Sequence, residues 1–161
     1  TEDRQGSGLC LELPCSWNIS LPNLAALGMG QVINPTREER RVAEFAAKVK
    51  VKWPGPAAPV LALSGGNQQK LLLARWLLAN SRFLIFDEPT RGIDVGAKQE
   101  IYALLNQLAR EGRAMLLISS ELNELLGVTD RILVMRRGEI AGELVTGQAT
   151  AEQIMQLAAV A

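Results

Sequence analysis

The sequence predicts an α/β fold, and two short apolar runs with a helical segment between them support this prediction. Residues 83–86 (Phe-Leu-Ile-Phe) and 114–118 (Ala-Met-Leu-Leu-Ile) are uninterrupted apolar runs, which are typical of strands buried on both faces. Between them, residues 97–110 repeat leucine and isoleucine at helical spacing, and Gly112 lies just past the last turn. A strand, a helix and a strand in this order predict parallel pairing through a crossover helix.

The first third of the chain predicts loops followed by one helix. Residues 1–35 contain seven glycine and proline residues, a density typical of loops and short turns. A helix is predicted over 36–49, because Thr36 and Glu39 match a capping box and the apolar side chains that follow recur on one face. The stretch 52–59 contains three prolines and predicts an irregular connector inside a domain.

The remaining elements are predicted from the same kinds of signal. Residues 67–79 are rich in leucine, glutamine, lysine and alanine, and predict a second helix. Residues 121–126 predict a short helix, and 131–135 with 139–145 predict a hairpin, because an Arg-Gly pair separates two apolar runs. A last helix is predicted over 151–159.

The composition fits one compact domain or a large part of one. The chain has 161 residues, of which 48% are hydrophobic, and its 17 basic and 17 acidic side chains cancel. Nucleic-acid binders usually carry a basic excess, so this balance argues against that class. No apolar run approaches the roughly 18 residues of a membrane span, and no secretion leader is present, which favours the cytoplasm. Cys10 and Cys15 match no zinc or redox spacing, and the chain contains no histidine.

A first candidate site is residues 63–70, Leu-Ser-Gly-Gly-Asn-Gln-Gln-Lys. Gly65 and Gly66 let the backbone approach a ligand closely, and the helix that follows would point free N–H groups and the positive end of its dipole at the same place. Ser64 adds a hydroxyl donor. The segment fits a phosphate site built without a charged side chain; the alternative is a serine cap and glycine turn before an ordinary helix.

A second candidate site lies where the run 83–86 ends in Asp87, Glu88 and Pro89. Open α/β sheets bind ligands at the carboxyl ends of their strands. Asp87 is suited to hold Mg²⁺, and Glu88 to face a water that attacks a terminal phosphate. The alternative is a strand that simply ends in a polar loop. Parallel pairing would bring Asp87, Glu88 and Ser119 together at one end of the sheet.

These segments and Gly92-Ile93-Asp94 stand in the order found in ABC-type ATPases, and the chain resembles that family. Residues 63–70 resemble the signature motif, 83–88 the Walker B motif with its catalytic glutamate, and 92–94 the D-loop. Residues 63–70 and 87–96 are similar to the ATPases of ribose, xylose and galactose importers. The resemblance implies ATP as the substrate and Mg²⁺ as its metal.

The resemblance also implies a P-loop NTPase-like ABC ATPase domain that is only partly present. The sequence contains no Gly-x-x-x-x-Gly-Lys-Ser/Thr, the phosphate loop of such domains. Residues 1–62 would be a Q-loop-like start and helical region. Residues 63–161 would carry the signature, Walker B, D-loop, switch region and C-terminal strands and helix. Importers of this type have two tandem domains, and we expect this chain to be the C-terminal one without its front part.

Individual residues receive roles from the same resemblance. Glu88 would be catalytic, and Asp87 would bind the metal. The residues implied in ATP binding are Ser64, Gly65, Gly66, Gln68, Asp94, Glu2 and Ser120. Glu2 stands where the family usually has the Q-loop glutamine, and Ser120 stands where it usually has a histidine.

In this family, two nucleotide-binding domains face each other head to tail, and each ATP lies between one phosphate loop and the other domain's signature. The implied partners are a second nucleotide-binding domain, membrane permease subunits and, indirectly, a periplasmic-type substrate-binding protein. The chain would lie at the cytoplasmic face of the membrane and bind no nucleic acid. Two alternatives stay open: a degenerate regulatory half with little hydrolysis, which Ser120 and Glu2 favour, and a nucleic-acid-associated ABC ATPase.

Overall fold

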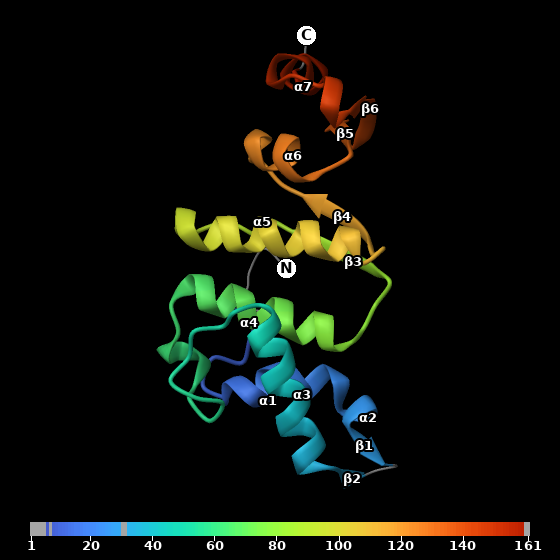
Figure 1. The fold of residues 1–161 in the computed structure, drawn as a ribbon. Helices are drawn as coiled ribbons and strands as arrows, with labels where there is room; N and C mark the ends of the chain where they lie inside the picture. Colours follow the sequence, from blue (N-terminus) through green and yellow to red (C-terminus); the bar gives the residue numbers. More distant parts are fainter. Residues whose placement is uncertain (1–5, 7, 30–31, 160–161) are drawn as a thin grey trace.

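The computed structural model describes residues 6, 8–29 and 32–159 of the chain, which form both helices and strands (Figure 1). In chain order the elements are α1 (Cys15–Ser20), the 3₁₀ helix η2 (Leu21–Asn23), α2 (Leu24–Leu27), β1 (Gly28–Met29), β2 (Val32–Ile33), α3 (Pro35–Lys48), the 3₁₀ helix η3 (Val60–Ala62), α4 (Gly65–Leu78), β3 (Phe83–Asp87), α5 (Val95–Arg110), β4 (Ala114–Ile118), α6 (Leu122–Val128), β5 (Arg131–Arg136), β6 (Glu139–Val145), the 3₁₀ helix η4 (Thr146–Gln148) and α7 (Ala151–Ala158).

The strand–helix–strand unit predicted from the sequence is present. Strands β3 and β4 pair in parallel, with Phe83 opposite Ala114 and Asp87 opposite Ile118. Helix α5 connects the two strands. The α/β class with a crossover helix is therefore confirmed.

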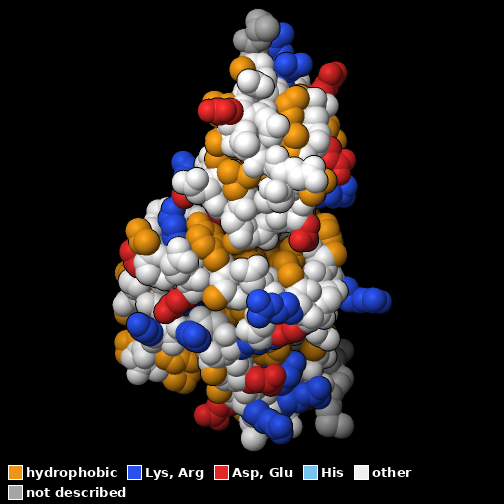
Figure 2. Space-filling model, turned by 45° about the horizontal axis from the view of Figure 1, so that its top comes forward, with side chains coloured by type: hydrophobic (Ala, Val, Ile, Leu, Met, Phe, Trp, Pro, Cys, Tyr) orange, Lys and Arg blue, Asp and Glu red, His pale blue; other side chains and the backbone are white. Residues whose placement is uncertain are grey.

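The molecule is elongated, and its elements follow one another along the long axis (Figure 1). Helices α1 and α3 pack against one side of α4, and α5 lies on its other side, next to the β3–β4 pair. The β5–β6 hairpin and α7 form the far end. Acidic and basic side chains are interspersed on the face shown in Figure 2. Among the described helices, none is long and apolar enough to cross a bilayer.

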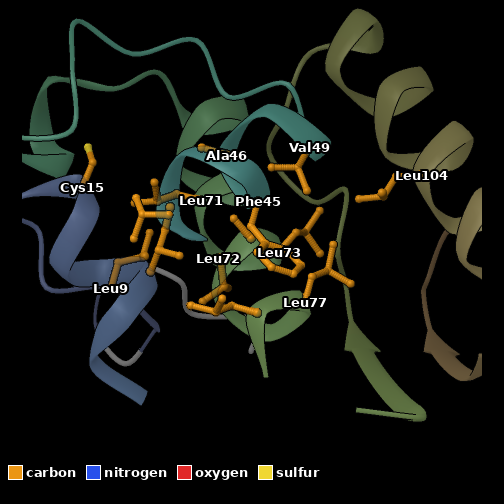
Figure 3. Packing of buried hydrophobic residues seen from close by; sticks show 14 of the residues in the cluster. Leu9, Cys15, Phe45, Ala46, Val49, Leu71, Leu72, Leu73, Leu77 and Leu104 are labelled. Atoms are coloured by element: carbon orange, nitrogen blue, oxygen red, sulfur yellow. The ribbon is translucent and has the colours of Figure 1, made fainter. Parts of the chain in front are cut away.

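Helix α4 is the centre of the larger core. Its Leu71, Leu72, Leu73 and Leu77 are all buried, so the helix is apolar on several sides rather than along one stripe. A helix of this kind is stable only when it is surrounded. Figure 3 shows these leucines among side chains from α1, α3 and α5, with Phe45 of α3 beside them.

A smaller core holds the C-terminal part of the chain. Ile132 and Val134 of β5 are buried against Ile154 of α7. Strands β5 and β6 pair antiparallel, as predicted, and the turn between them places both Arg137 (φ 51°) and Gly138 (φ 85°) in the left-handed region. Two such residues match the twist of a two-residue hairpin loop.

The predicted start of α3 is wrong by one residue, and a different residue caps the helix. The helix begins at Pro35 and not at Thr36, and its N-cap is Asn34, whose side-chain oxygen accepts a hydrogen bond of 3.1 Å from the Arg37 N–H. Proline is favoured at the first helical position because its fixed φ suits a helix and its missing N–H is not needed there. Glu39 therefore makes no capping box with Thr36. The other helices differ from their predicted bounds by two residues or fewer at each end.

The segment before α3 contains more structure than loops and turns. Cys15 and Ile19 of α1 are fully buried against the core around α4. Asn18 is also buried, and its side chain bonds the N–H and C=O of Cys10 at 2.9 Å each. The prediction of loops over 1–35 was wrong here, because long-range packing stabilises helices too short to form alone.

Strands β3 and β4 are covered on one face only, whereas the sequence predicted burial on both. Leu84 and Phe86 are buried, but Phe83 and Ile85 are 55% and 62% exposed. On β4, Leu116 and Ile118 are likewise exposed. The alternation follows from the two-residue period of a strand, since Leu84 and Phe86 belong to the same buried cluster as the leucines of α4 and α5.

Candidate functional site

The residues of the first candidate site form the beginning of α4. Ser64 has an extended backbone and is the N-cap, with its carbonyl accepting from the Gln68 N–H at 2.9 Å. Ser64 and Gly66 line an open pocket of about 200 Å³ together with Asp94 and Gly96 at the start of α5. The first turns of two helices therefore meet at one pocket, and both bring free N–H groups and positive dipole ends to it.

Gly66 is required by the closeness of the two helices. A Cβ at this position would lie 2.9 Å from the Cβ of Ala97, a distance that real side chains do not show. It would also lie 3.6 Å from Oδ2 of Asp94. Asp94 itself caps α5, because its Oδ1 accepts a hydrogen bond of 2.9 Å from the Ala97 N–H. The structure thus places Asp94 beside the signature segment of its own chain.

Two lysines line the same pocket, and sequence reasoning missed them. Lys52 belongs to the connector after α3, and Lys70 lies on the second turn of α4. Lys70 is buried, forms an ion pair with Glu100 of α5, and donates to the Lys50 carbonyl at 3.2 Å. Its hydrogen bond holds the pKa of Glu100 below the ordinary value. The predicted phosphate site therefore has two lysines beside it, and Lys70 already stood inside the 63–70 segment.

Two predicted site residues of the same segment, Gln68 and Gly65, lie away from the pocket. The Gln68 side chain is buried, and its amide donates to the carbonyls of Leu63 at 3.2 Å and Val60 at 3.4 Å. Neither Gln68 nor Gly65 is among the residues that line the pocket. Gln68 therefore binds η3 and the residue after it, which lead into α4.

The residues of the second candidate site meet at the carboxyl end of β3. The Glu88 N–H donates to the Ile118 carbonyl at 2.9 Å, and the Glu88 Oε1 accepts from the Ser120 N–H at 2.8 Å. Glu88 has φ 47°, in the left-handed region that non-glycine residues seldom adopt. Such strain is often found at functional sites. Asp87, Glu88 and Ser119 follow the ends of paired strands, as the sequence predicted.

The carboxylate of Asp87 is half-buried and makes no hydrogen bond or ion pair with any described residue. The pocket at Ser64 does not include Asp87, Glu88 or Ser120. The predicted site residues therefore form two groups, one at the start of α4 and one at the end of β3. Glu2 lies outside the described residues.

A buried acid near the second group was not found from the sequence. Glu124 of α6 is 1% exposed, and the Ser119 hydroxyl donates to its Oε2. Burial raises the pKa of the Glu124 carboxyl, the hydrogen bond from the Ser119 hydroxyl lowers it, and the charges of Glu121 and Glu88 raise it further. Among the described residues, neither the Glu124 Oε1 nor the nearby Thr90 Oγ1 has a hydrogen-bond partner. No motif marks this position, because its burial arises from how α6 packs.

Comparison with known proteins agrees with these motifs. A family model described as ABC transporter matches residues 15–91, which include both candidate segments. The ribose import ATP-binding protein RbsA of Bacillus cereus is 46% identical over 98% of this chain and 32% of its own length. The xylose import ATP-binding protein XylG of Histophilus somni is 48% identical over 98% of this chain and 31% of its own length. The chain thus spans about a third of these relatives.

The fold is also similar to solved structures. A dimeric ATP-binding cassette in a post-hydrolysis state, bound to ADP and Pi, superposes with a TM-score of 0.76 at 24% identity. The match covers 88% of this chain and 60% of that one. At this identity the likeness concerns the fold, which is the ABC ATPase fold. From its motifs, its fold and its relatives, the chain belongs to the ABC transporter family.

Proposed function

We propose that this chain is the signature- and Walker B-containing part of the ATP-hydrolysing subunit of an ABC importer for a monosaccharide. The observation that carries the proposal is Glu88, which lies beside Asp87 at the carboxyl end of β3 and is held by the Ser120 N–H at 2.8 Å. The names of relatives 46–48% identical support the sugar-import assignment.

The first site group would bind the phosphates of ATP. The Ser64 hydroxyl and the free N–H groups of the first turn of α4 are donors suited to phosphate oxygens. Gly65 and Gly66 permit the close approach that this needs. In the proposal, most other contacts to the triphosphate come from a phosphate loop on a second nucleotide-binding domain, in a head-to-tail pair. This chain would be the C-terminal of two tandem domains.

The second site group would serve metal binding and hydrolysis. The described residues contain no group of three or more metal-ligating side chains, so any ion must take further ligands from elsewhere. Mg²⁺ in nucleotide sites is bound by one or two carboxylates together with phosphates and water, and the unpaired carboxylate of Asp87 fits that pattern. The ion would offset negative charge on the phosphates. Glu88 would accept the proton of the attacking water.

The proposal also assigns partners. The subunit would lie at the cytoplasmic face of the membrane, bound to permease subunits that receive sugar from a periplasmic-type binding protein. Nucleic acid is not among these partners, which agrees with a net charge of zero.

A second candidate function is a degenerate regulatory half with little hydrolysis of its own. Ser120 favours it, because a serine there is too short to reach a phosphate as a histidine can and carries no positive charge. The substitution Ser120→His, measured with the glutamate of the other domain disabled, separates the two. A rise in turnover of about tenfold or more would favour the degenerate half, given the 1.5–3 kcal/mol of a hydrogen bond to a charged group.

The test of the main proposal uses the complete ATPase subunit with its permease in proteoliposomes. We expect ATPase activity that rises when binding protein loaded with ribose, xylose or galactose is added. Glu88→Gln should abolish the contribution of this site, whereas Glu111→Gln, a change in a surface ion pair with Lys48, should not. No stimulation by any sugar, or full activity in Glu88→Gln, would contradict the proposal.

A further inference from the structure

The side-chain amide of Asn67 lies between two partners whose hydrogen-bonding roles are fixed. The Lys52 backbone N–H lies 2.7 Å from the Asn67 Oδ1, and the Asn67 Nδ2 lies 2.9 Å from the Ser64 Oγ. A backbone N–H can only donate, so the amide oxygen must face Lys52 and the NH₂ group must face Ser64. The orientation of the amide is thus settled by its partners.

The direction of the Ser64 hydroxyl follows from this orientation. Because Oγ accepts a hydrogen from Asn67, the proton of Ser64 itself points elsewhere. No described residue accepts it, and Ser64 lines the pocket at the start of α4. The hydroxyl is therefore set as a donor toward the pocket.

The same contact also leaves the backbone N–H groups in the first turn of α4 without a side-chain cap. A serine N-cap ordinarily accepts from a backbone N–H of the second or third helical residue. Ser64 makes no such bond, since its oxygen accepts from the side chain of Asn67 instead. The N–H groups of Gly66 and Asn67 are thereby left for a ligand. Asn67 replaces a self-capped helix end with one whose donors all remain available.

The segment after α3, which includes Lys50 and the irregular connector that begins at Lys52, holds Asn67 in this position. It is fastened to α4 at two points, by the Lys52 N–H on Asn67 and by the Lys70 ammonium on the Lys50 carbonyl at 3.2 Å. Lys70 is in turn paired with Glu100. The backbone of this segment turns at Lys50, which has φ 53°. Asn67 is therefore restrained from one side while it orients Ser64 on the other.

We propose that Asn67 is a positioning residue, which directs the Ser64 hydroxyl proton and the free N–H groups of α4 toward a phosphate of bound ATP. The inference rests on the proposed function, in which Ser64 binds that phosphate. It assigns Asn67 no contact with the nucleotide.

The test is a double-mutant cycle of Asn67→Asp and Ser64→Ala in the complete subunit with its permease, with kcat and KM for ATP measured for each variant. Aspartate has the same shape as asparagine and still accepts from the Lys52 N–H. It cannot donate to Ser64, and it would take the Ser64 proton for itself. We expect Asn67→Asp to lower kcat/KM about 10- to 100-fold in the presence of Ser64.

In the Ser64→Ala background the same change should cost less than about threefold, because only its negative charge then acts. Asn67→Gln, which keeps both an amide donor and an acceptor, should stay closer to wild type than Asn67→Asp. If Asn67→Asp does not assemble, the cycle is made with Asn67→Leu and interpreted in the same way.

Equal losses in both backgrounds would overturn the inference and leave the proposed function standing, since Asn67 would then act independently of Ser64. An unchanged kcat/KM in Ser64→Ala alone would overturn the proposed role of Ser64 and the inference with it. A coupling of about fivefold or more between the two changes would support the inference.

Discussion

The backbone N–H of Ser120 donates to the carboxylate of Glu88 across the ends of two parallel strands, at 2.8 Å. Glu88 is also bonded to β4, because its own N–H donates to the carbonyl of Ile118, the last residue of that strand. Its left-handed backbone and its side chain are therefore both fixed by β4 and the residues just after it. The side chain of Ser120 has no part in this restraint. Substitutions at Ser120 can therefore separate the effect of its backbone N–H from that of its side chain.

Ser120→Ala and Ser120→Pro are expected to differ sharply in the complete subunit. Alanine keeps the N–H that holds Glu88, so kcat should stay within about threefold of wild type. Proline removes that N–H, and a hydrogen bond to a charged group is worth about 1.5–3 kcal/mol, so kcat should fall about 10- to 100-fold. ATPase assays on variants with matched thermal unfolding check this. Equal activities would show that the bond does not position Glu88.

Gly66→Ala is expected to destabilise the chain although alanine favours helices. The new Cβ would lie 2.9 Å from that of Ala97, so α4 and α5 must separate, and overpacking of this kind costs about 1–3 kcal/mol. Adding Ala97→Gly removes the obstructing atom and should restore part of the loss. Urea unfolding of wild type, Gly66→Ala and the double variant measures the effect. If the double variant were less stable than Gly66→Ala, the contact would not be the cause.

Several features of the fold were predictable because they depend on local signals. The strands β3 and β4 are apolar runs, and the acids at the end of the first run place Asp87 and Glu88 at the sheet edge. Arg137-Gly138 marks the hairpin turn. The start of α3 was missed because Asn34 and Thr36 are both good caps two residues apart. Pro35 decides between them by its preference for the first helical position.

Other features depend on contacts between distant segments, and no local pattern reveals them. Lys52 reaches the pocket because its N–H is bonded to Asn67, fifteen residues away in sequence. Glu124 is buried because α6 packs against α5 and η4. The exposed face of β3 was missed because an apolar run does not say whether both of its faces are covered; Ile85 is exposed and Leu84 is not.

The open face of β3 and β4 gives a prediction about self-association of the 161-residue chain. Ile85→Thr changes an exposed side chain, so it should alter the free energy of unfolding by less than about 1 kcal/mol and reduce association. Leu84→Thr changes the covered face of the same strand and should cost about 2–5 kcal/mol. Sedimentation and urea unfolding distinguish the two. Undiminished association in Ile85→Thr would mean that another surface drives it.

Glu124→Gln is expected to make the stability of the chain less sensitive to rising pH. Burial raises the pKa of the Glu124 carboxyl in the folded chain above its ordinary value of 4.5. Below pH 4.5 the carboxyl is protonated in both states and contributes no pH dependence. Above it the unfolded chain releases the proton first, so stability falls as pH rises toward the folded pKa, by at most about 1.4 kcal/mol per pH unit. Glutamine carries no such proton, so the variant should gain on wild type across this window.

Glu111→Gln is the matched control, because the pKa of Glu111 is shifted in the opposite direction from that of Glu124. Hydrogen bonds from Lys48 and Gln107 lower the pKa of Glu111, so its ionised form stabilises the folded chain above pH 4.5, and that contribution is lost as pH falls through the folded pKa. Glu111→Gln should therefore lose ground against wild type as pH rises up to about 4.5 and then stay level, whereas Glu124→Gln gains only above pH 4.5. Urea unfolding at a series of pH values from about 2.5 to 8 gives both differences in one experiment. A flat or falling difference for Glu124→Gln would mean that Glu124 is ionised in the folded chain, and that the charge is stabilised by the groups around Ser119.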